Sequence, residues 1–178
     1  DYNVDRPDDG FYPYGATPGH GFEWSRLMLH LEAALESRGR AAPPWLFADA
    51  AELFDASLRD GWASDGASGL AYTVDWQGRP NSRRRRHWTH AEALTAAAAF
   101  LRRTNEAHYE RWYRQLWDFI ATTFIDRARG GWQQELDSQL AIDPAESDVK
   151  PDLYHAYQAT LLPRLPLTPN LALAVEGL

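Results

Sequence analysis

The sequence predicts an all-α protein built from stacked pairs of helices, with short β-hairpins inserted between the pairs. Five segments carry apolar residues at the three- and four-residue spacing of one helix face. A Gly-Trp pair followed by a short extended stretch occurs at Gly61-Trp62 and again about 70 residues later at Gly131-Trp132. Such helical pairs bury their apolar stripes by stacking, either in an open solenoid or in a closed ring. A plain helical bundle is the alternative, but the long insertions count against it, because bundle loops are usually short.

The first helical pair is expected at about residues 20–37 and 44–59. Pro44 suits the first turn of the second helix, because proline lacks the N–H that would be left unbonded there. The apolar stripes of these two helices consist of Phe22, Leu27, Leu31, Leu35, Leu46, Ala50, Leu53, Phe54 and Leu58. The alternation in "LAYTVDWQGRP" then predicts a short hairpin with its turn at Gln77-Gly78.

The second helical pair is expected at about residues 88–103 and 106–125, and a fifth helix at about 151–162. The third helix is rich in alanine, and the fourth has aromatic residues at helical spacing. Between the fourth and fifth helices, "WQQELD" predicts a second short extended piece. Pro163 ends the fifth helix, because proline cannot continue the hydrogen-bond pattern, and a short apolar segment closes the chain.

Composition limits the classes of partner. The net charge of -7 argues against nucleic acid, and we interpret the arginine run 83–86 as a solvated loop. The absence of cysteine excludes a disulfide framework and a thiolate metal site, which fits a cytoplasmic protein. No apolar stretch approaches the roughly 20 residues of a membrane span, so we expect no membrane partner. Because the only methionine is Met28, we expect the chain to be part of a longer polypeptide.

Polar and aromatic residues recur near the starts of alternate predicted helices: His20, Glu23 and Trp24 at the first, Trp88 and Glu92 at the third, and Tyr154 and His155 at the fifth. If the pairs stack about a common axis, these helix ends converge on one cavity. Imidazole takes and returns protons near neutral pH, so two histidines there suit proton transfer on a polyol. Carboxylates orient an imidazole or hold sugar hydroxyls, and indole faces stack on the apolar faces of sugar rings.

Each of these residues also has a purely structural interpretation. His20 could cap its helix, and Glu23 or Glu92 could be a first-turn carboxylate favoured by the helix dipole. His155 could be a core histidine, and a single tryptophan is more often core than ligand platform. Three further histidines are interpreted as surface or packing residues: His30, His90 and His108. A metal site from His20, Glu23 and His155 is conceivable, but no HExxH motif or close ligand cluster supports it, so no metal or other cofactor is expected.

Five stretches carry a family resemblance and span nearly the whole chain in order: "GATPGHGFEWSRLMLHLEAALE", "PPWLFADAAELFDASLRDGWASDGASGLAYTVDWQGRP", "HWTHAEAL", "GGWQQELD" and "DLYHAYQATLLPRLPLTP". They resemble the N-acylglucosamine 2-epimerase superfamily, and within it the aldose-ketose isomerases that act on mannose or sulfoquinovose. The resemblance implies an (α/α)6 barrel, with residues 1–178 as the C-terminal half of its single catalytic domain. The other half is then expected on another chain or fragment, and association of identical copies stays open.

The resemblance also implies a metal-free isomerisation through a cis-enediol. In this scheme His20 opens the sugar ring and His155 moves a proton between C2 and C1, while Glu23 orients His20 and Glu92 holds hydroxyls. The complete set assigned to the site is His20, His155 and Glu23 for catalysis and Glu92, Trp88 and Trp24 for substrate binding. We favour mannose and related neutral hexoses, because a sulfosugar needs a cationic nest that the motifs do not provide.

Other functions stay open at this point. A sugar 2-epimerase of the N-acylglucosamine or cellobiose type would use its two histidines on opposite faces of C2, and a sulfoquinovose isomerase would share the isomerase chemistry. An α/α-barrel glycoside hydrolase would use Glu23 and Glu92 as its carboxylate pair. In a non-catalytic helical scaffold, the aromatic residues would serve only the core.

Overall fold

The computed structural model describes residues 3–7, 9, 13–142, 150–151 and 153–176. The helices are α1 (Pro18–Glu36), α2 (Pro44–Gly61), α3 (His87–Thr104), α4 (Ala107–Thr123), α5 (Leu153–Leu161), the 3-10 helix η1 (Leu162–Arg164) and α6 (Leu171–Val175). The strands are β1 (Thr73–Val74), β2 (Pro80–Ser82), β3 (Arg85–Arg86) and β4 (Glu135–Leu136). The five predicted helices and both predicted extended pieces are therefore confirmed, with small shifts at the helix ends.

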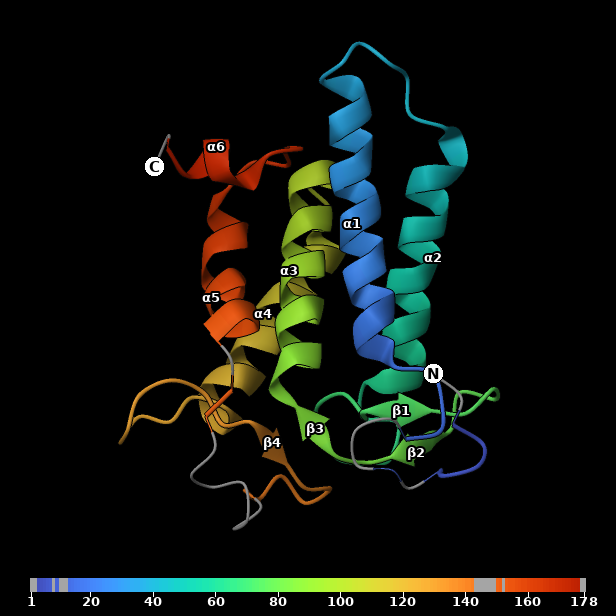
Figure 1. Ribbon diagram of the computed structural model, residues 1–178, viewed down its shortest axis with the longest axis vertical. Coiled ribbons are helices and arrows are strands. Elements are labelled where there is room, and N and C mark those ends of the chain that lie inside the picture. Colours follow the sequence, from blue (N-terminus) through green and yellow to red (C-terminus); the bar gives the residue numbers. More distant parts are fainter. Residues whose placement is uncertain (1–2, 8, 10–12, 143–149, 152, 177–178) are drawn as a thin grey trace.

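Three helices run side by side in the same direction, with the strands at their N-terminal ends (Figure 1). In this row α3 contacts α1 on one side and α5 on the other. The antiparallel helices α2 and α4 pack against α1 and α3, so each forms a hairpin with the helix that precedes it. Because α1, α3 and α5 begin at the same end of the molecule, residues in their first turns become neighbours although they are far apart in sequence.

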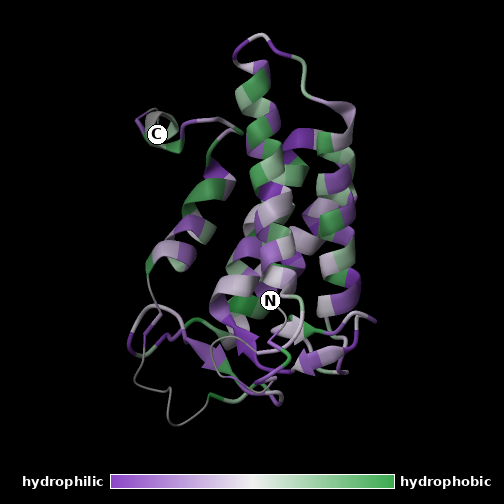
Figure 2. Cartoon of the chain, turned by 45° about the vertical axis from the view of Figure 1, so that its right-hand side comes forward, coloured by the Kyte–Doolittle hydropathy of each residue, from purple (hydrophilic) through white to green (hydrophobic). Residues whose placement is uncertain are grey.

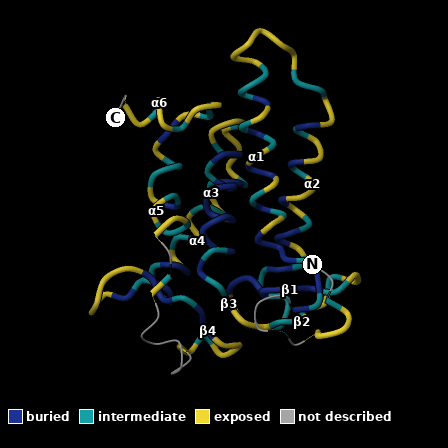
Figure 3. The backbone as a smooth tube through the Cα atoms, in the orientation of Figure 1, coloured by how far each residue is buried: buried dark blue, intermediate teal, exposed yellow. Residues whose placement is uncertain are grey.

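The centre of the described fold is α3, which is almost wholly buried (Figure 3). Its alanines, such as Ala93 and Ala97, have no exposed surface and allow the neighbouring helices to approach closely. An aromatic cluster ties α2, α3 and α4 together: the Phe100 ring lies 5.2 Å from Phe54 and 4.8 Å from Tyr109. Burial of these rings stabilises the packing of α2 and α4 against α3.

Hydrophobic and hydrophilic residues are interspersed along the helices, while the end that carries the strands is largely hydrophilic (Figure 2). This mixture is typical of amphipathic helices that bury one face each. Within the described residues, no helix combines the length and the apolar character that crossing a membrane requires.

The two inserted extended segments lie together at the end of the molecule where α1, α3 and α5 begin (Figure 1). Strands β1 and β2 pair antiparallel, and the predicted turn is confirmed, since Gly78 has a φ of +72°. Strand β3 pairs antiparallel with β4, so the residues directly before α3 are bonded to the segment between α4 and α5. The strands therefore fix the entry into α3, on which the candidate site depends.

The apolar stripe predicted for α1 is partly wrong. Phe22 is fully buried, but Leu27 and Leu31 are 40% and 49% exposed. The buried face continues instead through Arg26 and Leu29, because α2 and α3 cover that side of the helix. The exposed leucines lie on a face of α1 that no described element covers, so counting leucines alone does not identify the core side.

The interpretation of the arginine run 83–86 as a solvated loop is also wrong in part. The Arg85 side chain has no exposed surface and forms two bonds with the Asp65 carboxylate. The Arg86 guanidinium lies 4.6 Å from the centre of the Tyr72 ring. A buried guanidinium needs a carboxylate partner. Here that partner lies in a preceding loop, so the sequence of the arginine run alone does not predict the pairing.

Candidate functional site

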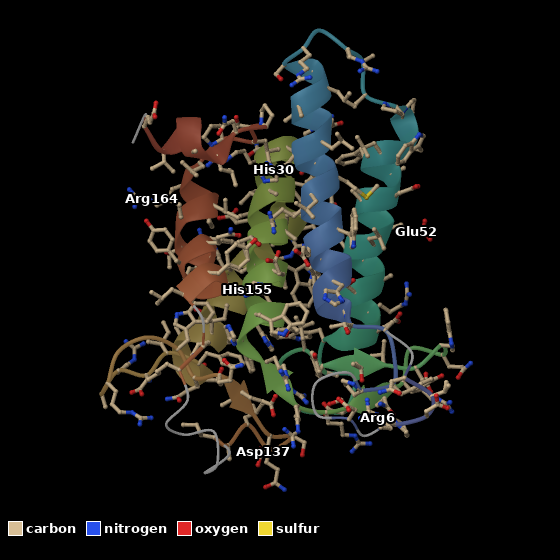
Figure 4. The ribbon with its side chains drawn as sticks, viewed as in Figure 1. Arg6, His30, Glu52, Asp137, His155 and Arg164 are labelled. Carbon is tan, nitrogen blue, oxygen red and sulfur yellow. The ribbon has the colours of Figure 1, made fainter. Side chains whose placement is uncertain are left out.

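Two histidines contact the same tryptophan at the strand end of the helix row. The His20 ring, in the first turn of α1, is centred 5.0 Å from the Trp88 ring. The His155 ring, on α5, is centred 5.8 Å from the same indole. His20 is exposed, whereas Trp88 and His155 are half-buried. The structure thus brings three of the predicted site residues together from three different helices, and Figure 4 labels His155 beside the lower part of α3.

The glycine of the "PGH" motif explains how His20 comes so close to Trp88. A Cβ atom built on Gly19 would lie 2.7 Å from the Trp88 ring and 2.7 Å from the Thr89 methyl group, which is closer than real Cβ atoms approach. Pro18 occupies the first turn of α1, where its missing N–H costs no hydrogen bond. The motif therefore begins the helix and lets its first turn lie directly against α3.

Glu92 lies just over one turn beyond Trp88 on α3 and is only 2% exposed. Its Oε2 accepts hydrogen bonds from Arg26 Nη2 at 2.8 Å and Arg26 Nε at 3.2 Å. Its other oxygen, Oε1, lies 3.8 Å from His155 Nε2. Glu92 therefore links α1 to α5, and its second oxygen faces an imidazole.

Two more rings surround His155. The Tyr154 ring is centred 4.7 Å away and the His87 ring 6.0 Å away, each nearly perpendicular to the imidazole. His87 is almost fully buried at the start of α3, and its Nδ1–H donates to the Gln134 carbonyl at 3.1 Å. The site is thus a cluster of aromatic and imidazole rings around one buried carboxylate.

Sequence reasoning missed Arg26 and His87 as neighbours of the site. Arg26 follows Phe22 by four residues and precedes Leu29 by three, so it falls on the buried face of α1. A charged residue at such a position requires a buried partner of opposite charge, and that requirement is the signal that could have identified it. His87 directly precedes Trp88, and nothing in the sequence distinguishes it from the other histidines.

The remaining two assigned residues, Glu23 and Trp24, both lie on α1. Glu23 is half-buried in the first turns of α1, three residues after His20. Trp24 is 62% exposed and, together with His20 and Leu53, lines a surface hollow of about 380 Å³ between α1 and α2. The roles given to Glu23 and Trp24 stay predictions. The described residues also contain no group of three His, Asp or Glu side chains arranged to hold a metal ion.

The packing role predicted for His90 is confirmed. Its ring is fully buried, and burial lowers its pKa to about 3, so the imidazole is neutral at physiological pH. The neutral ring accepts the Leu70 N–H at Nε2 and donates its Nδ1–H to the Arg86 carbonyl, at 2.9 and 2.8 Å. His90 thus fastens the segment before β1 to the start of α3.

Comparisons with known proteins identify the family of this chain. Residues 1–159 match the N-acylglucosamine 2-epimerase (GlcNAc 2-epimerase) family. The chain is 57% identical to the D-mannose isomerase of Pseudomonas cannabina pv. alisalensis, over 100% of this chain and 43% of that protein. It is 50% identical to the D-mannose isomerase of Thermobifida fusca, over 97% of this chain and 42% of that protein. The chain therefore spans less than half the length of these relatives.

Solved structures show the same fold. A crystal structure of D-mannose isomerase matches with a TM-score of 0.80 and 28% identity, covering 91% of this chain and 40% of that chain. The cellobiose 2-epimerase of Bacillus thermoamylovorans B4167 matches with a TM-score of 0.65 and 16% identity, covering 90% of this chain and 45% of that chain, a likeness of fold alone. The predicted fold class, paired helices that form part of an (α/α)6 barrel, is confirmed.

Proposed function

Because the chain belongs to the N-acylglucosamine 2-epimerase family, we propose that it forms part of an aldose-ketose isomerase that interconverts D-mannose and D-fructose. The observation that carries the proposal is the placement of His20 and His155 against one indole, Trp88. Two relatives at 57% and 50% identity are D-mannose isomerases, which supports the choice of reaction and of hexose.

In the proposed reaction His155 acts as the base. It removes the proton from C2 of the open-chain aldose, and the electrons of that bond form the C1–C2 double bond of a cis-enediol. In that first step the C1 carbonyl electrons move to O1, which gains a proton. The imidazole, whose proton exchanges with solvent, then delivers a proton to C1, and O2 loses its hydroxyl proton as the C2 carbonyl forms, giving the ketose. Imidazole suits this step because it binds and releases a proton near neutral pH.

His20 serves ring opening, which must come before enediol formation. We assign it the transfer of a proton from the anomeric hydroxyl to the ring oxygen. Its exposure at the first turn of α1 leaves the ring accessible to a sugar, and contact with Trp88 fixes its orientation. The indole provides an apolar surface on which one face of the sugar rests.

Glu92 supports His155 in this scheme. The carboxylate is 2% exposed, and one of its oxygens is already occupied by Arg26. Its free oxygen lies 3.8 Å from His155 Nε2, where a negative charge stabilises the imidazolium that forms when the C2 proton is taken. The hydroxyl-binding role expected for Glu92 from the sequence stays a prediction.

The rest of the barrel is the proposed partner of this chain, with residues 1–178 as the C-terminal half of one catalytic domain. The chain spans only 43% and 42% of two D-mannose isomerases that it resembles. Trp24, Leu27 and Leu31 expose apolar surface on one face of α1, next to the hollow that His20 lines. We propose that the other half covers this face and closes the cavity. The absence of cysteine supports a cytoplasmic location.

The test is an assay of this chain joined to the rest of the barrel, below called the complete protein. D-Mannose is supplied in D2O, and the expected product is D-fructose with deuterium at C1. Substituting His155→Ala or His20→Ala is expected to lower kcat by about a hundredfold or more, since proton transfer by a positioned group contributes that much. His108→Ala, on α4 away from Trp88, is the matched control and keeps full activity.

Three results would contradict the proposal. Conversion of D-mannose to D-glucose alone would make the protein a 2-epimerase, and conversion only of sulfoquinovose would change the substrate. Release of aryl alcohol from an aryl glycoside, without isomerisation, would favour a hydrolase. If both histidine variants keep full activity, the ring cluster around Trp88 is structural only.

A further inference from the structure

We propose that Arg26 is a positioning residue of this site. It fixes the orientation of the Glu92 carboxylate, and through Glu92 it controls the position and the protonation of the His155 imidazole. The inference rests on the proposed role of His155 as the proton-transferring base. Arg26 touches neither the sugar nor the reacting atoms in this scheme, so its effect travels through Glu92.

The geometry of the pair leaves Glu92 little freedom. The side chains of Arg26 and Glu92 are 5% and 3% exposed, so water does not compete for either group. Both guanidinium donors, Nε and Nη2, bond to the same oxygen, Oε2. With Oε2 held in this way, the carboxylate cannot rotate freely, and Oε1 stays turned toward His155 Nε2 at 3.8 Å.

A need to join α1 to α3 does not account for Arg26. A second ion pair already connects the two helices, between Arg103 on α3 and Glu32 on α1, with 2.6 Å between Nε and Oε2. That pair lies toward the C-terminal ends of α1 and α3, away from Trp88. Desolvation makes a fully buried ion pair a weak source of stability. The Arg26 pair therefore differs from its counterpart in its deeper burial and in its link to His155.

The charge of Arg26 also balances the charge of Glu92. Titratable groups near His155 include Glu92 and His87 from α3 and Tyr154 from α5, and His20 contacts the same Trp88 ring as His155. With the guanidinium present, the negative charge of Glu92 is balanced by an ion pair. Without it, Glu92 and His155 together hold their last proton more tightly, whichever of the two carries it. Less free base is then available near neutral pH.

The main experiment compares the pH dependence of mannose isomerisation in the complete protein with that of Arg26→Met. We expect the acid limb of the kcat/KM profile to move by about one pH unit or more toward higher pH. At pH 7, kcat should fall about tenfold or more, with KM changed much less, because Arg26 does not touch the sugar. A residue that acts by positioning the base is expected to change kcat much more than KM.

Arg26→Lys separates the effect of the positive charge from the effect of orienting Glu92. It also keeps the proposal testable if Arg26→Met fails to fold. The lysine keeps the positive charge, so the acid limb should stay close to that of the unchanged protein. It cannot hold Oε2 with two parallel donors, so kcat should still fall several-fold. A lysine variant with unchanged kcat would refute the orienting role, and one with a fully shifted acid limb would refute the charge role.

The matched control is Arg103→Met, which removes the other ion pair between α1 and α3. It should lower the melting temperature less than Arg26→Met, because the Arg103 side chain is 42% exposed, and it should leave the pH profile unchanged and kcat within about twofold of the unchanged protein. If Arg103→Met shifts the pH profile as Arg26→Met does, Arg26 is a structural residue and the inference fails.

A readout without substrate distinguishes this inference from the proposed function. The imidazole nitrogen resonances of His155, assigned by NMR with His155→Gln, are followed against pH in the complete protein and in both Arg26 variants. A titration midpoint that moves upward in Arg26→Met and not in Arg26→Lys supports the coupling even if no tested sugar is isomerised. An identical midpoint in all three proteins overturns it even if isomerase activity is present.

Discussion

Arg85 and Asp65 form a buried ion pair with two parallel bonds, 2.7 Å from Nη1 to Oδ2 and 2.6 Å from Nη2 to Oδ1. The same guanidinium donates to the carbonyl oxygens of Ala67 and Ser68. One side chain therefore holds the loop after α2 onto strand β3, directly before the helix that carries Trp88. The pair therefore supports the entry into α3, together with the bond from the Leu70 N–H to His90.

The ion pair predicts a loss of stability in acid. The hydrogen bond from Arg85 lowers the pKa of Asp65, so the unfolded chain binds a proton at higher pH than the folded one. The stabilisation is therefore complete above about pH 4 and is lost as the pH falls through the lower pKa of the folded state. Asp65→Asn should lower the free energy of unfolding by about 3 kcal/mol at pH 7, because it leaves Arg85 buried without a carboxylate.

The measurement is urea unfolding of the complete protein and Asp65→Asn at pH 7 and pH 3. The difference between the two proteins should shrink at pH 3, where Asp65 begins to lose its charge. Glu110→Gln, which breaks the exposed pair of Glu110 with Arg114, is the control and should change stability far less at either pH. A loss of the same size for both variants would show that burial does not matter here.

His90 predicts a second, separate acid effect. Burial lowers its pKa to about 3, whereas an unfolded histidine titrates near 6.5. Between these values the unfolded chain binds one proton more than the folded chain. Stability due to this group is therefore complete above about pH 6.5 and falls as the pH decreases, by up to about 1.4 kcal/mol per pH unit.

Urea unfolding at pH 7 and pH 5 tests this effect, because Asp65 remains charged over that range. His90→Gln should be less stable than the unchanged protein at pH 7, since the imidazole bonds to Leu70 and Arg86 are lost or altered. Its stability should decrease less between pH 7 and pH 5. Equal decreases in both proteins would mean that His90 is not the group that titrates.

Local patterns predict the elements well because each signal lies within a few residues. Pro44 starts α2, the Gly78 turn closes the hairpin, and the Gly61-Trp62 and Gly131-Trp132 pairs locate the two insertions. The convergence of His20, Trp88 and His155 was also expected, but only because the helical pairs were assumed to stack about one axis. Their actual proximity depends on the contacts of α3 with both α1 and α5.

Charged residues whose partners are distant in sequence could not be predicted in this way. Arg26 pairs with Glu92 on another helix, and Arg85 pairs with Asp65 across the hairpin. In each case the burial of a charge is a property of the tertiary structure. The local sequence pattern shows only that the residue is polar and does not show whether it is buried. The exposed leucines of α1 show that apolar residues can also be misassigned. A stripe of apolar residues on a helix does not predict which side of the helix a neighbouring helix will cover.

Gly19 predicts an effect on activity that exceeds its effect on folding. In Gly19→Ala the new methyl group would meet the Trp88 ring and the Thr89 methyl group at 2.7 Å, so the first turn of α1 must move away from α3. His20 moves with it, and misplacement of a reacting group by about 1 Å can cost a hundredfold in rate. We expect kcat/KM for D-mannose to fall about tenfold or more in the complete protein.

The control for Gly19→Ala is Ser37→Ala at the exposed far end of the same helix, which should leave kcat/KM unchanged. Melting temperatures of both variants should stay within a few degrees of the unchanged protein, because the displaced turn lies at the edge of the core. A Gly19→Ala variant with full activity would show that the close approach of α1 to α3 is not needed to place His20.

Lys150 ties the start of α5 to the loop after α4. Its Nζ lies 2.5 Å from Asp126 Oδ2, and the same carboxylate accepts bonds from Arg129 Nε and from the Arg129 N–H. The Lys150 ammonium is the main cause of the lowered pKa of Asp126, so the contact remains charged throughout the neutral range. Because α5 begins three residues after Lys150, the contact helps to place His155.

Lys150→Met should therefore lower kcat/KM several-fold and speed hydrogen exchange of the amides in the first turn of α5, measured by mass spectrometry on the complete protein. Arg129→Met is the matched control, since it removes a bond to the same carboxylate but one that stays within its own loop. That variant should leave exchange in α5 and activity nearly unchanged. Equal effects of the two substitutions would show that the loop as a whole, and not its link to α5, supports His155.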